Sequence, residues 1–244
     1  MDKQLSSPSY RPLYDQIKVL ITQSLIGGEW GPGDVIPSEI ELAARYKVSQ
    51  GTVRKAIDSL SAENILIRRQ GKGTFVATHS EEVTKLRFLR LTAVDGKKEL
   101  LHNELISCVK SKADNYIAKI LEIKAGAATI EVKRLLTFSG RPIIYDHLIV
   151  PAATFKGLNG NKVEECNGSM YSMYESQFGI RMIRAEERLK AVGADQEVAK
   201  ALGLKEGFPL LSIERVSFTY GDKPMEWRLG LCLTDDHHYM SELE

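Results

Sequence analysis

The stretch that decides the fold is residues 33–76, GDVIPSEIELAARYKVSQGTVRKAIDSLSAENILIRRQGKGTFV. It contains two short helical patterns, each with its own start signal, followed by a basic hairpin that carries glycines. That order is what a helix-turn-helix with a wing needs in order to reach DNA. We therefore take this stretch as the starting point for both fold and function.

The first helical pattern begins after Pro37. Ser38 is the predicted N-cap, and Glu39 and Glu41 place negative charge in the first turn, where the helix dipole favours it. The apolar side of this helix consists of Leu42, Ala43 and Tyr46.

The second helical pattern begins at Ser49, the next predicted N-cap. Val53, Ile57 and Leu60 recur at i, i+4 and i+7 and are expected to face the core. A recognition helix reads base edges from its N-terminal end, and its unbonded N–H groups there favour phosphate. The side chains left outside near that end are Ser49, Gln50, Thr52, Arg54 and Lys55.

The basic hairpin is predicted from the strand-like residues 65–69 and 74–76 on either side of Gln70-Gly71-Lys72-Gly73. Glycines on both sides of Lys72 let the backbone approach a phosphate closely. Arg68 and Arg69 alternate faces, so at most one is expected to point at the nucleic acid. The alternative is a helix-turn-helix that binds no DNA, with merely solvated charges. The residues expected to contact DNA are Ser38, Ser49, Gln50, Thr52, Arg54, Lys55, Arg68, Gln70, Gly71 and Lys72.

Four motifs in this half resemble the winged-helix domain of GntR-family bacterial transcription regulators, over about residues 10 to 77. They are Leu13-Tyr14-Asp15-Gln16-Ile17, Gly31-Pro32-Gly33-Asp34 with Ile36-Pro37-Ser38-Glu39, Val48-Ser49 with Thr52-Val53-Arg54, and residues 69–76, RQGKGTFV. Family members often carry arginine where this chain has Ile40 and Gln50. Because arginine prefers guanine and glutamine prefers adenine, the resemblance implies DNA binding without giving the operator.

The whole chain of 244 residues suits two domains, with a net charge of only +1. Through Thr78 there are ten Lys and Arg against eight Asp and Glu, so the basic character is a local patch. The three separated cysteines fit neither a disulfide framework nor a zinc motif, and they suit a reducing cytosol. The N-terminus lacks a signal peptide's apolar core, and no apolar run approaches ~20 residues. We therefore expect a cytoplasmic protein with no membrane partner.

We expect a DNA-binding domain at residues 9–77, a linker at 78–86 and a mixed α and β domain at 87–244. In the last domain, alternating apolar patterns and turn signals predict a series of strands and helices. The strands are expected at residues 105–110, 128–136, 143–150, 183–192, 209–218 and 225–234, and the helices at 113–121, 170–178 and 195–202.

This second half is similar to the effector-binding domain of the HutC subfamily of GntR regulators, over roughly residues 85 to 243. The motifs are Arg134 before Gly140-Arg141-Pro142-Ile143, Pro151 with residues 155–158, Ser169-Met170-Tyr171, Ala191, Ala199 and Leu202 with residues 209–211, and residues 221–226, GDKPME. That domain shares the chorismate-lyase fold. The resemblance implies an α+β protein, a winged helix-turn-helix followed by a chorismate-lyase-like domain with an antiparallel sheet.

Because the fold relative is a lyase, a chorismate-lyase-like enzyme with an accessory DNA domain is the alternative function. The sequence offers no catalytic motif for it, with no HExxH, GxSxG, phosphate loop or paired cysteines. His237 and His238 are adjacent, would point apart, and are interpreted as a solvated polar tail. Cys232 is interpreted as a core residue. We therefore expect no catalytic residues, no metal site and no cofactor.

Arg134 lies in an otherwise apolar predicted strand, where a buried guanidinium needs an anionic partner. That partner is either a structural carboxylate, Glu186 or Glu226, or a carboxylate or phosphate on an effector held by a bidentate clamp. In the HutC subfamily a second arginine often follows two residues later, where this chain has Leu136. This departure favours a small carboxylate over a phosphorylated sugar. The resemblance places effector contacts at Arg134, Asp146, Ser169, Tyr171 and Glu226.

Together with these patterns, the two resemblances imply a ligand-responsive bacterial transcription regulator, a repressor whose operator binding is modulated by a small anionic effector. A homodimer, formed chiefly through the C-terminal domain, would read two half-sites of double-stranded operator DNA. The effector would change operator binding by favouring one arrangement of the two DNA-binding domains.

Overall fold

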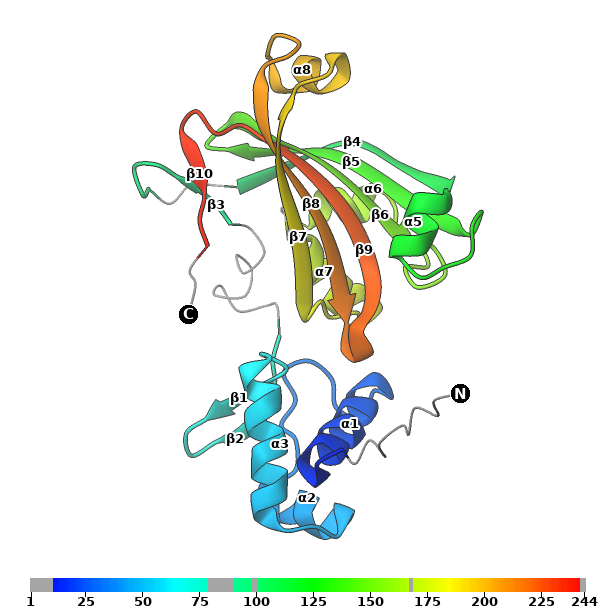
Figure 1. The fold of residues 1–244 in the computed structure, drawn as a ribbon, viewed down its shortest axis with the longest axis vertical. Coiled ribbons are helices and arrows are strands. Elements are labelled where there is room, and N and C mark those ends of the chain that lie inside the picture. Colours follow the sequence, from blue (N-terminus) through cyan, green and yellow to red (C-terminus); the bar gives the residue numbers. More distant parts are fainter. Residues whose placement is uncertain (1–10, 79–89, 98–100, 167–168, 242–244) are drawn as a thin grey trace, which may run out of the picture. The chain divides into compact units, whose positions relative to one another are not determined.

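The computed structural model describes residues 11–78, 90–97, 101–166 and 169–241 (Figure 1). The chain divides into two compact units, Met1–Ala77 and Thr78–Glu244. Of the expected linker, 78–86, all but Thr78 lies outside the described residues.

The first unit is a helix-turn-helix followed by a two-stranded wing, as the sequence predicts. Its elements are α1 (Leu13–Ile26), α2 (Glu39–Tyr46), α3 (Gln50–Ala62), β1 (Leu66–Arg69) and β2 (Gly73–Val76). Both predicted N-caps are confirmed. The Ser38 side chain accepts from the Glu41 N–H in a full capping box, and the Ser49 side chain accepts from the Thr52 N–H.

The core of the first unit lies between α1 and α3. Its fully buried side chains include Ile17 and Ile21 of α1, packed with the predicted core residues of α3, Val53, Ile57 and Leu60. For residues 12–25 the sequence predicts a helix whose apolar face consists of Leu13, Ile17, Leu20, Ile21 and Leu25. That face is partly wrong, because Leu13 is 50% exposed and Leu20 is 40% exposed. Leu20 precedes Ile21 by one residue and so points about 100° away around the helix, while Leu13 is the first residue of α1.

The wing is attached to the helices by the segment before α2. The Ile36 N–H donates to the Thr74 carbonyl at 2.9 Å, and the Val76 N–H donates to the Asp34 carbonyl at 2.8 Å. Residues 34–36 therefore run alongside β2. Because Pro37 and Ser38 lead directly into α2, this pairing fixes the wing beside the N-terminus of that helix.

The second unit is built on a six-stranded antiparallel sheet with the strand order β4-β5-β6-β9-β8-β7. All six expected strands are present, with their ends shifted by up to four residues. The strands are β4 (Leu101–Lys112), β5 (Ala128–Phe138), β6 (Arg141–Pro151), β7 (Arg184–Gly193), β8 (Pro209–Thr219) and β9 (Lys223–Cys232).

Among the described residues of the second unit, four short α-helices cover this sheet, and three of them were predicted: α5 (Asn115–Ile120), α7 (Met170–Phe178) and α8 (Gln196–Leu202). The fourth, α6 (Gly160–Glu165), lies with α7 over one face of the sheet (Figure 1). There Val132 and Leu148 pack with Phe155, Met173 and Tyr174. The same face carries the polar side chains described below.

A small additional sheet forms from β3 (Leu91–Ala93) and β10 (His237–Tyr239), neither of which was predicted. The interpretation of His237 as part of a solvated tail is wrong. Its ring is buried, with its centroid 5.4 Å from that of Phe138, whereas His238 is exposed. The two rings point apart as expected, because adjacent residues of a strand face opposite ways. Cys232 is buried in the core, as predicted.

Candidate DNA-reading surface and buried polar network

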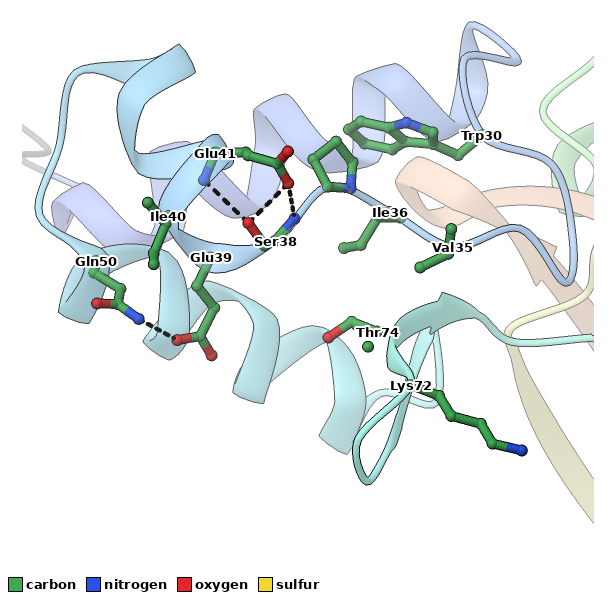
Figure 2. Close-up of a pocket in the computed structure, with 12 residues that line it drawn as sticks. Trp30, Val35, Ile36, Ser38, Glu39, Ile40, Glu41, Gln50, Lys72 and Thr74 are labelled. Atoms are coloured by element: carbon green, nitrogen blue, oxygen red, sulfur yellow. Dashed lines mark hydrogen bonds between the residues drawn. The ribbon is translucent and has the colours of Figure 1, made fainter.

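A groove of about 720 Å³ lies between the start of α2, the first turn of α3 and the wing (Figure 2). Gln50 and Glu39 line one side, and Lys72 and Thr74 line the other. Ile40, the residue after Glu39, also lines the groove and is 67% exposed. The groove thus combines the three elements from which the sequence predicts DNA contacts.

Glu39 is the centre of the polar contacts on this surface. Its Oε2 accepts from Nε2 of Gln50 at 3.2 Å and from Nε of Arg54 at 3.0 Å, and its Oε1 accepts from Arg68 at 3.0 Å. The hydrogen bond from Arg54, together with that from Gln50, lowers the pKa of Glu39 against the opposing effect of burial. Glu39 in turn raises the pKa of Arg54. Three predicted DNA contacts are therefore joined through one carboxylate that the sequence interpretation assigned only to the helix dipole.

Three of the predicted contacts are the hydroxyl side chains of the N-caps Ser38 and Ser49 and of Thr52 in the first turn of α3. Ser38 Oγ lies 2.7 Å from the Glu41 carboxylate, and Ser49 Oγ lies 2.8 Å from Oγ1 of Thr52. These hydroxyls are part of the helix caps and stand apart from the Glu39 contacts. Lys55 is exposed on α3, one residue beyond Arg54.

The wing turn brings Gln70, Gly71 and Lys72 to the surface, where all three are exposed. Gly71 has φ +69° and Gly73 has φ +106°, in the left-handed region that favours glycine, so the turn depends on both. The Lys72 N–H donates to the Arg69 carbonyl at 2.9 Å, while the Lys72 side chain extends away from the groove (Figure 2).

The two neighbouring arginines of β1 diverge, as their alternation predicts. The Arg69 guanidinium lies over the Phe75 ring, 4.7 Å from its centroid. Arg68 instead turns toward the helices, where it pairs with Glu39 and, at 2.9 Å, with Asp58 of α3. Arg68 is therefore the one that belongs to the predicted DNA surface.

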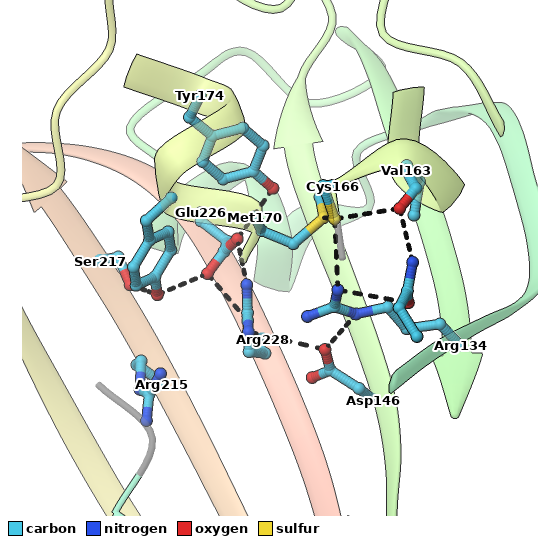
Figure 3. A network of polar contacts seen from close by, with 12 residues as sticks. Arg134, Asp146, Val163, Cys166, Met170, Tyr174, Arg215, Ser217, Glu226 and Arg228 are labelled. Carbon is cyan, nitrogen blue, oxygen red and sulfur yellow. Dashed lines mark hydrogen bonds and ion pairs between the residues drawn. The ribbon is translucent and has the colours of Figure 1, made fainter. Parts of the chain in front are cut away.

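In the second unit, the predicted effector residue Arg134 is fully buried on β5. Its Nε donates to Oδ2 of Asp146 on β6 at 2.8 Å, and its Nη1 lies 3.4 Å from Oδ1 of Asn103 on β4 (Figure 3). The structural partner expected from sequence, Glu186 or Glu226, is therefore wrong. Arg134 and Asp146 are direct neighbours in the antiparallel register, which places both side chains on one face.

Glu226 of β9 is the centre of a second set of contacts. Arg228 donates two hydrogen bonds to its carboxylate, from Nε at 3.0 Å and from an η nitrogen at 2.8 Å. The hydroxyls of Tyr171 and Tyr174 on α7 each donate to the same carboxylate at 2.9 Å (Figure 3). Arg228 also approaches Oδ2 of Asp146 at 3.5 Å. The two sets therefore form one buried network between the sheet and α7.

The network extends across the sheet beyond the predicted residues. The Tyr171 hydroxyl lies 2.7 Å from Oγ of Ser217 on β8, and Arg215 of the same strand donates to Glu187 of β7 at 2.7 Å. Ser169, also predicted, stays outside these contacts and bonds Ser172 at 2.8 Å. Tyr174, Glu187, Arg215, Ser217 and Arg228 were missed. Strand periodicity could have found some of them, because residues two apart on a strand face the same side of the sheet. Arg215 and Ser217 are spaced in this way on β8, and so are Glu226 and Arg228 on β9.

Protonation in this network follows from the close pairing of opposite charges. Burial alone would raise the pKa of Asp146, but Arg228 and Arg134 outweigh it and lower that pKa. Burial opposes the charge on Arg228 in the same way, yet Asp146 and Glu226 raise its pKa well above the ordinary value. Burial, with Glu226 nearby, also raises the pKa of Tyr174 well above its ordinary value. These pKa shifts favour the charged forms of Asp146 and Arg228 and the neutral form of the Tyr174 hydroxyl.

In the part of the chain that the structure describes, no group of three or more His, Cys, Asp or Glu side chains is placed to hold a metal ion. Within the same residues, no helix is both long enough and apolar enough to span a bilayer.

Comparison with known proteins identifies both units. Residues 13–76 match the family described as bacterial regulatory proteins, gntR family, and residues 97–238 match the UTRA domain. The chain is 32% identical over 237 residues to the uncharacterized HTH-type transcriptional regulator YurK of Bacillus subtilis, covering 95% of each chain. It is 26% identical over 234 residues to the mannosyl-D-glycerate transport/metabolism system repressor MngR of Escherichia coli, covering 94% of this chain and 95% of that one.

A solved structure is similar to the second unit. It is described as the ligand-binding domain of a GntR-family transcriptional regulator from Bordetella bronchiseptica, and it superposes with a TM-score of 0.63 at 38% identity. The match covers 65% of this chain and 98% of that one. The chain therefore belongs to the GntR family, with a UTRA domain after the winged helix. It is a DNA-binding transcription regulator with an effector-binding domain, in a family that includes a named repressor.

Proposed function

We propose that this protein is a repressor that binds a two-fold symmetric operator as a homodimer and is released by a small anionic effector. The observation that carries the proposal is that Gln50, Arg54 and Arg68 converge on Glu39 at the first turn of α3, beside a groove that Lys72 of the wing also lines. In this proposal residues 9–77 form the DNA-binding domain and residues 87–244 form the domain that binds the effector and dimerises. Residues 78–86 are the linker between the two domains. Two half-sites supply the contacts that one winged helix cannot.

The buried network supports the choice of effector. It combines Arg134, Arg215 and Arg228 with an equal number of carboxylates, Asp146, Glu187 and Glu226. An anionic ligand enters such a balanced site by replacing a protein carboxylate at one arginine, where a guanidinium binds it bidentately. The name of MngR, a repressor of a mannosyl-D-glycerate system, supports a carboxylate-bearing sugar.

The protein works in the cytoplasm, where the operator is, and it binds its effector without converting it. The rival function is catalysis by a chorismate-lyase-like domain. Recovery of the ligand unchanged from the complex supports regulation, whereas turnover supports the enzyme.

The test begins with selection of binding sequences from random duplex DNA by the full chain. We expect enrichment of two related half-sites about one helical turn apart, or a multiple of it. The selected operator is then titrated with sugar carboxylates and sugar phosphates, and release of DNA by a carboxylate is expected. Failure to enrich any sequence contradicts the DNA-binding function, and release only by phosphorylated sugars contradicts the proposed effector class.

A further inference from the structure

Three side chains proposed to contact DNA are held by one carboxylate, that of Glu39. Glu39 is the first residue of α2, whereas Gln50 and Arg54 belong to α3 and Arg68 belongs to β1. The Glu39 side chain is 19% exposed, compared with 55% for Arg54 and 42% for Arg68. The carboxylate therefore lies behind the cations, on the protein side of the surface they form.

The contacts of Glu39 are not needed to form the N-terminus of α2. The capping box at this helix is complete with Ser38 and Glu41, whose carboxylate receives the Ser38 N–H at 2.8 Å. Glu39 does place charge near the helix dipole, but that role requires no contact with α3 or β1. Its contacts across three elements are therefore an additional feature of this surface.

A phosphate and Glu39 compete for the same guanidinium groups. Any duplex presents phosphates regardless of sequence, so cations that reach them freely increase binding to every sequence. Arg54 faces Glu39 through Nε and one η nitrogen, and a guanidinium has five N–H donors in a fixed plane. A base-edge acceptor in the correct position can therefore bind the outer edge of Arg54 while Glu39 holds the inner edge.

We propose that Glu39 is a specificity-determining positioning residue, which keeps Gln50, Arg54 and Arg68 from binding DNA of the wrong sequence. The proposal rests on the DNA-reading function proposed above. On random DNA the contacts with Glu39 persist, so Arg54 and Arg68 do not bind the phosphates of the backbone. On the operator the same contacts fix the orientation of Gln50 and Arg54 toward the bases.

The experiment compares the full-length wild type with Glu39→Gln and with Glu29→Gln. The control removes the same charge from the same unit, but Glu29 pairs with Arg45 rather than with the DNA-facing side chains. Affinity is measured for the selected operator and for a random duplex of equal length, across a series of salt concentrations. Thermal melting is recorded for each variant.

For Glu39→Gln we expect binding to the random duplex to tighten about tenfold at 0.1 M salt, because Arg54 and Arg68 can then contact phosphates of the DNA backbone. The salt slope on that duplex should become steeper by about 1–2, and the ratio of operator to random affinity should fall about tenfold. Glu29→Gln should leave the ratio unchanged.

Three results would overturn the proposal. The first is equal weakening on both duplexes with a lower melting temperature, which indicates a structural role. The second is a ratio of operator to random affinity, and a salt slope on the random duplex, that are the same for Glu39→Gln as for Glu29→Gln. The third is an altered base preference at one position with unchanged random affinity, which indicates that Glu39 itself reads a base. If the wild type shows no sequence preference, the DNA-reading function fails, and this inference fails with it.

Discussion

At the scale of single residues, Gln50 is the side chain best placed to read a base. It is the first residue of α3, and its amide nitrogen is oriented by Glu39. Glutamine pairs with N6 and N7 of adenine, whereas arginine pairs with O6 and N7 of guanine. Gln50→Arg should therefore change the preferred base at one position of each half-site, with a discrimination of about 1–3 kcal/mol.

Repeated selection with the variant measures this change. Gln23→Arg, on the exposed surface of α1, adds the same charge outside the recognition helix and serves as the control. A consensus that stays the same after Gln50→Arg would remove Gln50 from the set of base-reading residues.

Arg134 and Asp146 form a buried ion pair, with exposed fractions of 1% and 2% for the two side chains. Removing one partner of such a pair leaves an uncompensated charge, whereas replacing both with apolar side chains is often neutral. Arg134→Met should lower the free energy of unfolding of the second unit by about 3–5 kcal/mol, and Arg134→Met with Asp146→Leu should restore most of it.

Urea unfolding of the two variants measures these stabilities, and operator release by the effector is then tested on the stable double variant. Loss of release in a folded double variant supports Arg134 as an effector contact. A normal effector response in that variant would leave Arg134 and Asp146 as a structural pair alone.

The sequence shows that Arg134 needs an acidic partner but not which one. Strand periodicity gives the face on which a side chain lies, whereas the partner depends on the register between strands. The pairing of β5 with β6 places Asp146 opposite Arg134, while Glu226 lies on β9 and is held by Arg228. The caps Ser38 and Ser49 were predictable because their signals are local.

At the scale of elements, the wing is the part most clearly suited to the DNA backbone. Lys72 is exposed between Gly71 and Gly73, both with positive φ. Lys72→Ala should weaken binding to operator and random DNA alike and reduce the salt slope by about one, because one phosphate contact is lost. Affinities measured against salt on both duplexes test this prediction, and a loss confined to the operator would contradict it.

Elements with a strong local signal were predicted well, whereas the two three-residue strands β3 and β10 and the short helix α6 were not. The helix expected at residues 170–178 is α7, Met170–Phe178, and each expected strand of the large sheet is present. By contrast, β3 and β10 have three residues each and are stabilised by pairing between distant parts of the chain. A three-residue strand is too short to show periodicity, so its pairing cannot be read from the sequence.

At the scale of the whole molecule, operator and effector binding must be coupled reciprocally. An effector that weakens operator binding is itself bound more weakly by the operator complex, by the same factor. We expect a coupling of about 1–3 kcal/mol, a 5–150-fold change in each affinity. Calorimetric titration of the effector into the protein, with and without operator, measures the factor. Effector binding that is indifferent to operator would contradict the proposed control.

The most direct test of DNA reading by the first unit is the ratio of two affinities of the full-length wild-type protein. One is for the selected operator and the other is for a random duplex of equal length, both at physiological salt. We expect the operator to bind at least about 10³-fold more tightly. Equal affinities for the two duplexes would contradict sequence-specific repression by this protein.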